Sequence, residues 1–317
     1  MKDIHCGSVL LDLDCSQITE GNGLNNLPAG VERLVVHLEA NSIPYAVSPS
    51  LRQALENSPQ LRTCQTSTPC LPEQSDGAAS EPLRAQFQAV AHSLGLKPEE
   101  CLIVVTDLAR CQVACDLGMT AVALAERKED RQKFESSICA LSSLFDLRLE
   151  EFGLPAFTDW VDNVLPLAQV LRCKGPVVKG FGRGSKMLGI PTANLEAEAL
   201  AASLQEVLPP CGIYGGWASV GNSATVYQMV MSIGWNPYFD NKQKSVEPWL
   251  LHEFPEDFYG EELRLLVDHY IRPEANFTTL EALVETIHND ADVARGALQH
   301  GSLASDRDDA FLKPNPV

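Results

Sequence analysis

The sequence predicts two domains of different class, an α/β domain with a parallel sheet and then a mainly β domain that closes into a small antiparallel barrel. Its 317 residues are enough for two separate hydrophobic cores. Through residue 124, short apolar runs alternate with segments of helical period, which is typical of a parallel sheet covered on both faces. From Val177 onward, strand-like segments separated by turn residues dominate, as in a small barrel.

The elements of the first half follow in order from their apolar patterns. Runs of three to five apolar residues predict buried strands, and apolar residues three and four apart predict helices. A segment rich in Ser, Thr, Pro and Gln at 63–80 is expected to be a loop. The strands are expected at 9–11, 43–47, 101–105 and 120–124, and the helices at 31–40, 83–94 and 109–117.

The second half is expected to begin after a connecting helix and turn at 145–171, which contain Gly153, Pro155 and Pro166. Strands at 213–220, 226–233, 249–254 and 263–271 are followed by an amphipathic helix at about 279–298. These patterns predict domains at 1–160 and 161–300. The polar segment 301–317 is expected to be a mobile tail.

Composition excludes several classes of function. A net charge of −18 argues against a nucleic-acid partner and against an anionic membrane surface. No stretch approaches the roughly 20 apolar residues of a membrane span. Ten cysteines without a secretory signal are expected to be free thiols in a reducing compartment, so the cytoplasm is the expected location. The oligomeric state stays open.

The segment 180–194, GFGRGSKMLGIPTAN, carries the clearest chemical pattern. Gly180, Gly182 and Gly184 lack Cβ atoms and let the backbone approach a ligand closely, and Lys186 supplies a cation. Alone, three alternating glycines are as typical of a flexible turn as of an anion site. The pattern is not a Walker loop, because Ser185 precedes the lysine instead of following it.

Thr192 and Asn194 follow within the same segment. A hydroxyl and an amide oxygen are hard ligands of the kind that a magnesium–phosphate complex takes. A phosphate-binding loop, a cation and cation ligands together indicate a nucleotide-dependent phosphotransferase.

This segment resembles the riboflavin kinase family, and further motifs agree in order. They are GWNPY at 234–238, SVEPWLLHEF at 245–254, DFYG at 257–260 and IRPEANF at 271–277. The resemblance covers roughly residues 165–300. It implies a barrel with a C-terminal helix that makes FMN from riboflavin and ATP.

The resemblance also assigns roles to residues. Glu247 occupies the position of the catalytic base, which would accept the proton of the riboflavin 5′-hydroxyl. Thr192 and Asn194 would hold Mg²⁺, or Zn²⁺ or Mn²⁺ in its place, and the segment from Gly180 to Lys186 would cover the ATP phosphates. The segments expected to line the flavin pocket contain Asn236, Tyr238, Arg272 and Phe277.

One departure from the family pattern lies just before the last of these motifs. Asp268 and His269 stand where the family usually has a small or apolar pair that often ends in glycine. The pair could shift the backbone near Arg272, or it could form a local ion pair.

The first half resembles the haloacid dehalogenase (HAD) superfamily, in the order found in plant-type enzymes that join an FMN-hydrolysing domain to riboflavin kinase. Asp12 and Asp14 after an apolar strand match the nucleophile and the general acid/base, and Ser48 matches the second motif. Two departures argue against phosphatase activity. Glu81 stands where a lysine is expected, and Thr106 replaces an acid of the metal-binding pair.

Two further departures point the same way. Cys15 replaces the turn glycine, and only about 34 residues separate the first two motifs, too few for a helical cap. We therefore expect a riboflavin kinase behind a degenerate HAD-like domain without a cap. One alternative is a bifunctional enzyme that hydrolyses FMN through Asp12 and Asp14. Another is a flavin-binding or scaffold protein without turnover.

Overall fold

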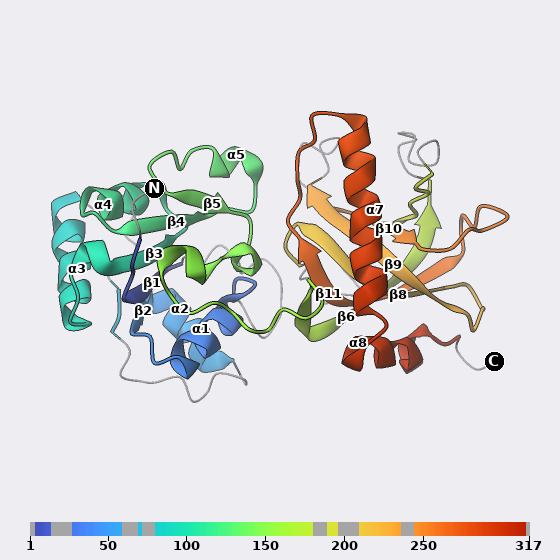
Figure 1. The fold of residues 1–317 in the computed structure, drawn as a ribbon, viewed down its shortest axis with the longest axis horizontal. Coiled ribbons are helices and arrows are strands. Elements are labelled where there is room, and N and C mark those ends of the chain that lie inside the picture. Colours follow the sequence, from blue (N-terminus) through green and yellow to red (C-terminus); the bar gives the residue numbers. More distant parts are fainter. Residues whose placement is uncertain are drawn as a thin grey trace. The chain divides into compact units, whose positions relative to one another are not determined.

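The computed structural model describes residues 4–13, 27–58, 69–71, 80–179, 189–195, 209–235 and 244–314. The chain divides into two compact units, Met1–Thr158 and Asp159–Val317 (Figure 1). In the described part of the chain, no helix has the length and apolar character needed to cross a membrane.

The first unit contains a five-stranded parallel sheet of order β2-β1-β3-β4-β5. Its first four strands in the sequence are fully or largely buried, which explains why they are continuous apolar runs without alternation, whereas the edge strand β5 is half-buried. The strands are β1 (Ser8–Asp12), β2 (Tyr45–Val47), β3 (Cys101–Val105), β4 (Thr120–Leu124) and β5 (Cys139–Leu141).

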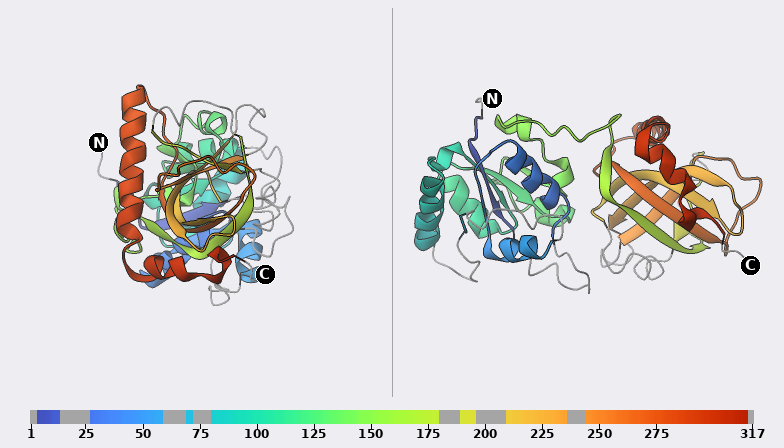
Figure 2. Two further views of the ribbon diagram at one scale, coloured as in Figure 1. Left: turned by 90° about the vertical axis from the view of Figure 1, so that its right-hand side faces the viewer. Right: turned by 90° about the horizontal axis from the view of Figure 1, so that it is seen from below.

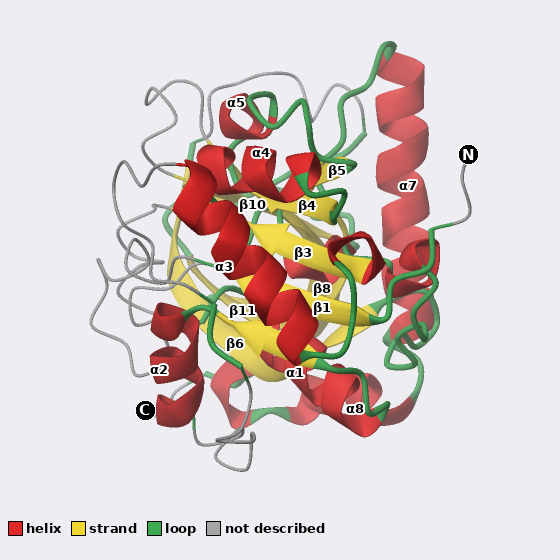
Figure 3. Cartoon of the chain, turned by 90° about the vertical axis from the view of Figure 1, so that its left-hand side faces the viewer, coloured by secondary structure: helices red, strands yellow, loops and turns green. Residues whose placement is uncertain are grey.

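Helices cover both faces of this sheet (Figure 3). Val9 and Leu11 of β1 pack on one face with α1 and α2, whereas Leu10 packs on the other with α3 and α4. This alternation follows from the two-residue period of a strand. The helices are α1 (Val31–Ala40), α2 (Pro49–Asn57), α3 (Ser80–Ser93), α4 (Leu108–Asp116) and the short α5 (Lys128–Arg131).

The second unit is a six-stranded antiparallel sheet of order β10-β9-β8-β11-β6-β7. The amide of Ala193 beside β7 donates to the Pro248 carbonyl of β10 at 2.8 Å, so the two ends of the sheet meet and the barrel is nearly closed (Figure 2). The strands are β6 (Leu165–Val178), β7 (Asn194–Leu195), β8 (Gly212–Val220), β9 (Val226–Trp235), β10 (Lys244–Leu250) and β11 (Glu262–Arg272).

A long helix, α7 (Leu280–Ala297), lies along the outside of the barrel (Figure 2). The Thr279 hydroxyl accepts a hydrogen bond from the Ala282 amide and caps its first turn. Ala291, Ala294 and Ala297 recur every three residues on its buried stripe and let the helix approach the barrel closely. The predicted fold class, a parallel α/β domain before a small antiparallel barrel with a helix, is confirmed.

Two predicted elements of the second half are wrong. Residues 145–171 do not form a connecting helix, because short 3₁₀ turns at Leu144–Asp146 and Leu149–Phe152 precede β6, which begins at Leu165. β6 alternates exposed and buried side chains poorly, so its period did not reveal it. The strand expected at 249–254 lies earlier, at Lys244–Leu250, because residues after Leu250 turn away as a bend.

Residues 301–314 are ordered and not the mobile tail that the sequence predicts. They form α8 (Gly301–Ser305) and two 3₁₀ turns, and Leu303 and Leu312 are buried against the barrel. The Trp217 indole donates to the Leu303 carbonyl at 2.8 Å, and Arg172 of β6 pairs with Asp309 at 2.6 Å. Two buried leucines hidden among polar residues gave too weak a pattern to predict this packing.

Candidate functional site

Glu247 lies in the middle of β10, opposite Ser232 of β9. Alternation along the strand puts its side chain on the same face as Trp249, whose ring packs edge-on against His288 of α7 at 5.6 Å. Glu247 therefore belongs to the face of the barrel that α7 covers. Its side chain is half-buried and makes no hydrogen bond or ion pair in the part of the chain that the structure describes.

Backbone contacts bring Thr192 and Asn194 next to this strand. Ala193, which stands between them, donates its amide to the carbonyl of Pro248, the residue after Glu247. Asn194 is also paired with Val178 across β6 and β7. The side chains of Thr192 and Asn194 are half-buried. Asn194 on β7 and Thr192 just before it thus lie along the strand that carries the predicted base.

Six residues predicted for the kinase site lie outside the described residues. These are Gly180, Gly182, Gly184 and Lys186 of the glycine-rich segment, and Asn236 and Tyr238 after β9. The described residues around the glycine-rich segment are Lys179 and Gly189. The strand pair that flanks it, β6 with β7, joins it to the same edge of the barrel as Thr192 and Asn194.

Arg272, at the end of β11, is held by α7. Its guanidinium donates to both carboxylate oxygens of Asp290, at 2.8 and 2.7 Å, and to the Pro273 carbonyl at 2.9 Å. It also lies 5.9 Å from the centre of the Phe277 ring. Arg272 therefore fastens the following loop and α7 to the barrel. Sequence reasoning missed Asp290, because its burial is seen only in the structure. A buried aspartate rarely lacks a basic partner.

Glu274, in the loop that follows Arg272, lies over the face of β9 that carries Gly234. A Cβ atom on Gly234 would come within 2.2 Å of a carboxylate oxygen of Glu274, so a larger residue there would displace the Glu274 side chain. The Glu274 carboxylate therefore lies beside β9, two residues along the strand from Ser232, which is opposite Glu247.

Asp268 and His269 form a buried hydrogen-bonded pair on β11. His269 Nδ1 lies 2.5 Å from Asp268 Oδ1, and both residues are at most 1% exposed. The strand register shifts between Val267 and His269, so the pair also bends the backbone, as the sequence left open. Burial raises the pKa of the Asp268 carboxyl, and its hydrogen bond to His269 opposes that rise.

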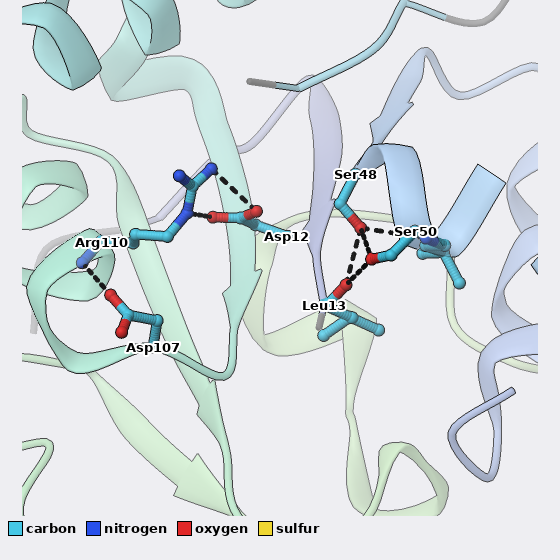
Figure 4. A network of polar contacts seen from close by, with 7 residues as sticks. Asp12, Leu13, Ser48, Ser50, Asp107 and Arg110 are labelled. Carbon is cyan, nitrogen blue, oxygen red and sulfur yellow. Dashed lines mark hydrogen bonds and ion pairs between the residues drawn. The ribbon is translucent and has the colours of Figure 1, made fainter. Parts of the chain in front are cut away.

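In the first unit, Asp12 ends β1 and is fully buried. Its two carboxylate oxygens accept the Nε and Nη2 hydrogens of Arg110, the second at 2.9 Å (Figure 4). Arg110 comes from α4 and is itself almost fully buried. Asp14 lies outside the described residues. Sequence reasoning missed Arg110, which would have stood out only as a basic residue three positions after Asp107.

The other HAD-like motif residues also have partners within the protein. The Ser48 hydroxyl donates to the Leu13 carbonyl at 2.7 Å and accepts from the Leu51 amide, capping α2 (Figure 4). Asp107 accepts from the Arg110 amide at 2.8 Å and caps α4. Glu81 is an exposed residue of the first turn of α3.

Comparison with known proteins identifies the family. A family model described as riboflavin kinase (flavokinase) matches residues 167–298. The bifunctional riboflavin kinase/FMN phosphatase of Arabidopsis thaliana is 42% identical over 294 residues, which cover 91% of this chain and 76% of that protein. The chain belongs to the riboflavin kinase family.

Riboflavin kinases from animals match a shorter part of the chain. Those of Mus musculus and Homo sapiens are 48% and 47% identical over 141 residues, 44% of this chain and 89% of each of those proteins. The match to the Arabidopsis protein, by contrast, extends over both units. The chain is thus a riboflavin kinase domain preceded by a parallel α/β domain that the match to the Arabidopsis protein also covers.

Proposed function

We propose that the second unit transfers the γ-phosphate of ATP to the 5′-hydroxyl of riboflavin and so makes FMN. The observation that carries this proposal is the contact of Ala193 with Pro248, the residue after Glu247, together with the lack of a partner for Glu247 among the described residues. A scaffold protein would have no need of a half-buried carboxylate without a partner in the described chain. Membership in the riboflavin kinase family supports the same reaction.

Glu247 would act as the general base. An alcohol is a weak nucleophile near neutral pH, so a carboxylate in hydrogen-bond reach accelerates the reaction by accepting its proton. As the riboflavin 5′-oxygen forms its bond to the γ-phosphorus, the bond from that phosphorus to the β–γ bridging oxygen breaks, and ADP leaves. The hydroxyl proton passes to Glu247.

Thr192 and Asn194 would hold the metal. A hydroxyl and an amide oxygen beside a carboxylate suit a hard cation, so Mg²⁺ fits this donor set, and Zn²⁺ or Mn²⁺ are alternatives. When bound, the cation would neutralise charge on the ATP phosphates. We place Gly180, Gly182, Gly184 and Lys186 over those phosphates, because the segment joins the barrel at the same edge. This local arrangement is needed, since a net charge of −18 repels ATP at long range.

The flavin would lie between β9, the loop after β11 and α7. Phe277 belongs to the loop after β11 and offers an aromatic face for stacking, and Asn236 and Tyr238, which follow β9 in the sequence, remain candidates from the resemblance. Arg272 would act as a positioning residue, since Asp290 and the Pro273 carbonyl already engage its guanidinium. The cytoplasmic location remains a prediction from composition.

The test is formation of FMN from riboflavin, ATP and Mg²⁺, followed by chromatography. We expect FMN to appear, to require the metal, and to be lost in Glu247→Gln but kept in Glu285→Gln, which removes an exposed carboxylate from α7. Thr192→Val should raise the Mg²⁺ concentration needed for half-maximal rate. Absence of FMN with any of Mg²⁺, Zn²⁺ and Mn²⁺ would contradict the proposal, as would full activity of Glu247→Gln.

A further inference from the structure

The strongest unassigned feature of the molecule is the buried contact between Asp12 and Arg110. A HAD-like phosphatase needs the carboxylate at the end of β1 to be available to a phosphate and to a metal. Here both of its oxygens accept hydrogens of one guanidinium, and neither residue is open to solvent. Arginine stays charged at any pH that a protein experiences, so this partner does not leave by deprotonation.

Arg110 is fixed in place from three directions. Asp107 caps the helix that carries it, Phe87 of α3 lies 5.2 Å beneath its guanidinium, and Asp12 holds its planar fork. A lysine could not make the same two parallel hydrogen bonds. The contact is thus built into the packing of α3, α4 and β1.

The residues around this pair do not fit a divalent cation. Asp12 is engaged by Arg110, Asp107 turns to the amide of α4, and Thr106 offers no carboxylate. The structure reveals no cluster of three or more acidic, histidine or cysteine side chains that could hold a metal among the residues it describes. Ser48, which would meet the phosphate, donates its hydroxyl to the Leu13 carbonyl instead.

We propose that the Arg110 guanidinium occupies the place where a HAD-like phosphatase would hold its metal. This arginine therefore prevents phosphatase activity in the N-terminal domain. The domain then binds no Mg²⁺ at Asp12 and hydrolyses no FMN, although it retains the sheet and the nucleophile position of a phosphatase. The Asp12–Arg110 pair serves to hold β1 to α4. This inference does not depend on the kinase reaction, because it concerns the other unit.

Hydrolysis by the wild-type chain is the first test. FMN and Mg²⁺ are incubated without ADP, so that reversal of a kinase reaction cannot release riboflavin. We expect no riboflavin and no cleavage of p-nitrophenyl phosphate. Metal-dependent release of riboflavin that is lost in Asp12→Asn would overturn the proposal. This result is independent of whether the same preparation makes FMN.

A double-mutant cycle tests the ion pair itself. All four tryptophans, Trp160, Trp217, Trp235 and Trp249, lie in the second unit, so fluorescence follows the barrel while far-ultraviolet circular dichroism follows both units. Arg110→Met should lower the denaturation midpoint seen by circular dichroism and leave the fluorescence midpoint unchanged. Arg84→Met, which removes a partly exposed pair with Asp116 in the same unit, is the control and should shift the circular-dichroism midpoint much less than Arg110→Met does.

The double variant Asp12→Leu/Arg110→Met decides whether the effect comes from the pair. Removing both charges removes the buried carboxylate that Arg110→Met leaves without its arginine, so the midpoint should recover most of the loss caused by Arg110→Met. Additive losses in the double variant would overturn the proposed pairing. If Arg110→Met does not fold, folding of the double variant would support the pairing, and failure of both to fold would count against it.

Discussion

Asp12 on β1 and Glu247 on β10 are both carboxylates of motifs that resemble phosphate-transferring or phosphate-hydrolysing families, but they differ in burial and in hydrogen-bond partners. Asp12 is fully buried and both of its oxygens are engaged by Arg110. Glu247 is half-buried and has no partner in the described chain. A carboxylate can accept a proton or attack a phosphate only if its lone pairs are available. The contrast teaches that a carboxylate in a motif can act in catalysis only where neighbouring side chains leave its oxygens without partners.

The largest expected effect is the loss of the available carboxylate. Glu247→Gln should lower kcat for FMN formation roughly 10²–10⁴-fold, the usual contribution of a general base. Asp12→Asn should leave kcat within about 2-fold, because we assign Asp12 no part in that reaction and single substitutions away from a site are usually neutral. Steady-state kinetics of both variants measures the contrast directly. Equal losses in the two variants would break the comparison.

The buried pair should dominate stability rather than catalysis. Arg110→Met leaves the Asp12 carboxylate buried without its partner, which should cost about 3–5 kcal/mol of unfolding free energy. The exposed control Arg84→Met should cost no more than about 1 kcal/mol, because solvent screens that pair. Urea denaturation followed by circular dichroism gives both values. A similar cost for the two substitutions would mean that Arg110 does not hold Asp12.

A third carboxylate, Asp290, sharpens the comparison on the kinase side. Asp290→Asn weakens the two charge-assisted hydrogen bonds to Arg272 and should loosen the loop that carries Phe277. Loss of about 1–2 kcal/mol at this place would raise the KM for riboflavin by roughly 5–30-fold. The kcat and the KM for ATP should change little. A change in kcat alone would assign Asp290 a different role.

The smallest expected effect is a pH dependence at Asp268. Burial raises the pKa of this carboxyl in the folded state above its value in the unfolded chain. Folding then favours the protonated form, and the associated stability is lost as pH rises from the ordinary carboxyl range through the raised pKa. His269 opposes the rise and Asp306 adds to it.

The matched variant for this carboxyl is Asp268→Asn, which does not ionise. Its stability relative to the wild-type chain should increase with pH across that window and stay constant above it. Thermal denaturation at a series of pH values measures the difference. A difference that falls with pH would mean that the pairing with His269 outweighs burial.

Much of the fold was predictable because local patterns agreed with it. The strand at Cys101–Val105 and the helix at Val31–Ala40 have the predicted bounds, since a buried parallel strand is a pure apolar run and an amphipathic helix shows its period. β6 escaped prediction, because most of its side chains are half-buried or exposed and the strand as a whole shows no regular apolar period. The segment after residue 300 escaped because its packing depends on two leucines alone.

The candidate site was predictable only in part. The motifs indicated Glu247, Thr192 and Asn194, but their proximity depends on a backbone bond between distant segments that no local pattern contains. Arg110 and Asp290 were missed for the same reason. Each acts through a partner far along the sequence, Asp12 for the first and Arg272 for the second. A single sequence identifies the type of each residue, whereas the partner that the fold brings to it determines whether its side chain is available for binding or catalysis.

The most direct measurement compares both activities in one preparation. Riboflavin with ATP and Mg²⁺ is incubated in one tube, FMN with Mg²⁺ alone in another, and both are separated by chromatography. An available Glu247 and an engaged Asp12 predict FMN in the first tube and no riboflavin in the second. Riboflavin in the second tube that disappears in Asp12→Asn, or no FMN in the first, would contradict the account.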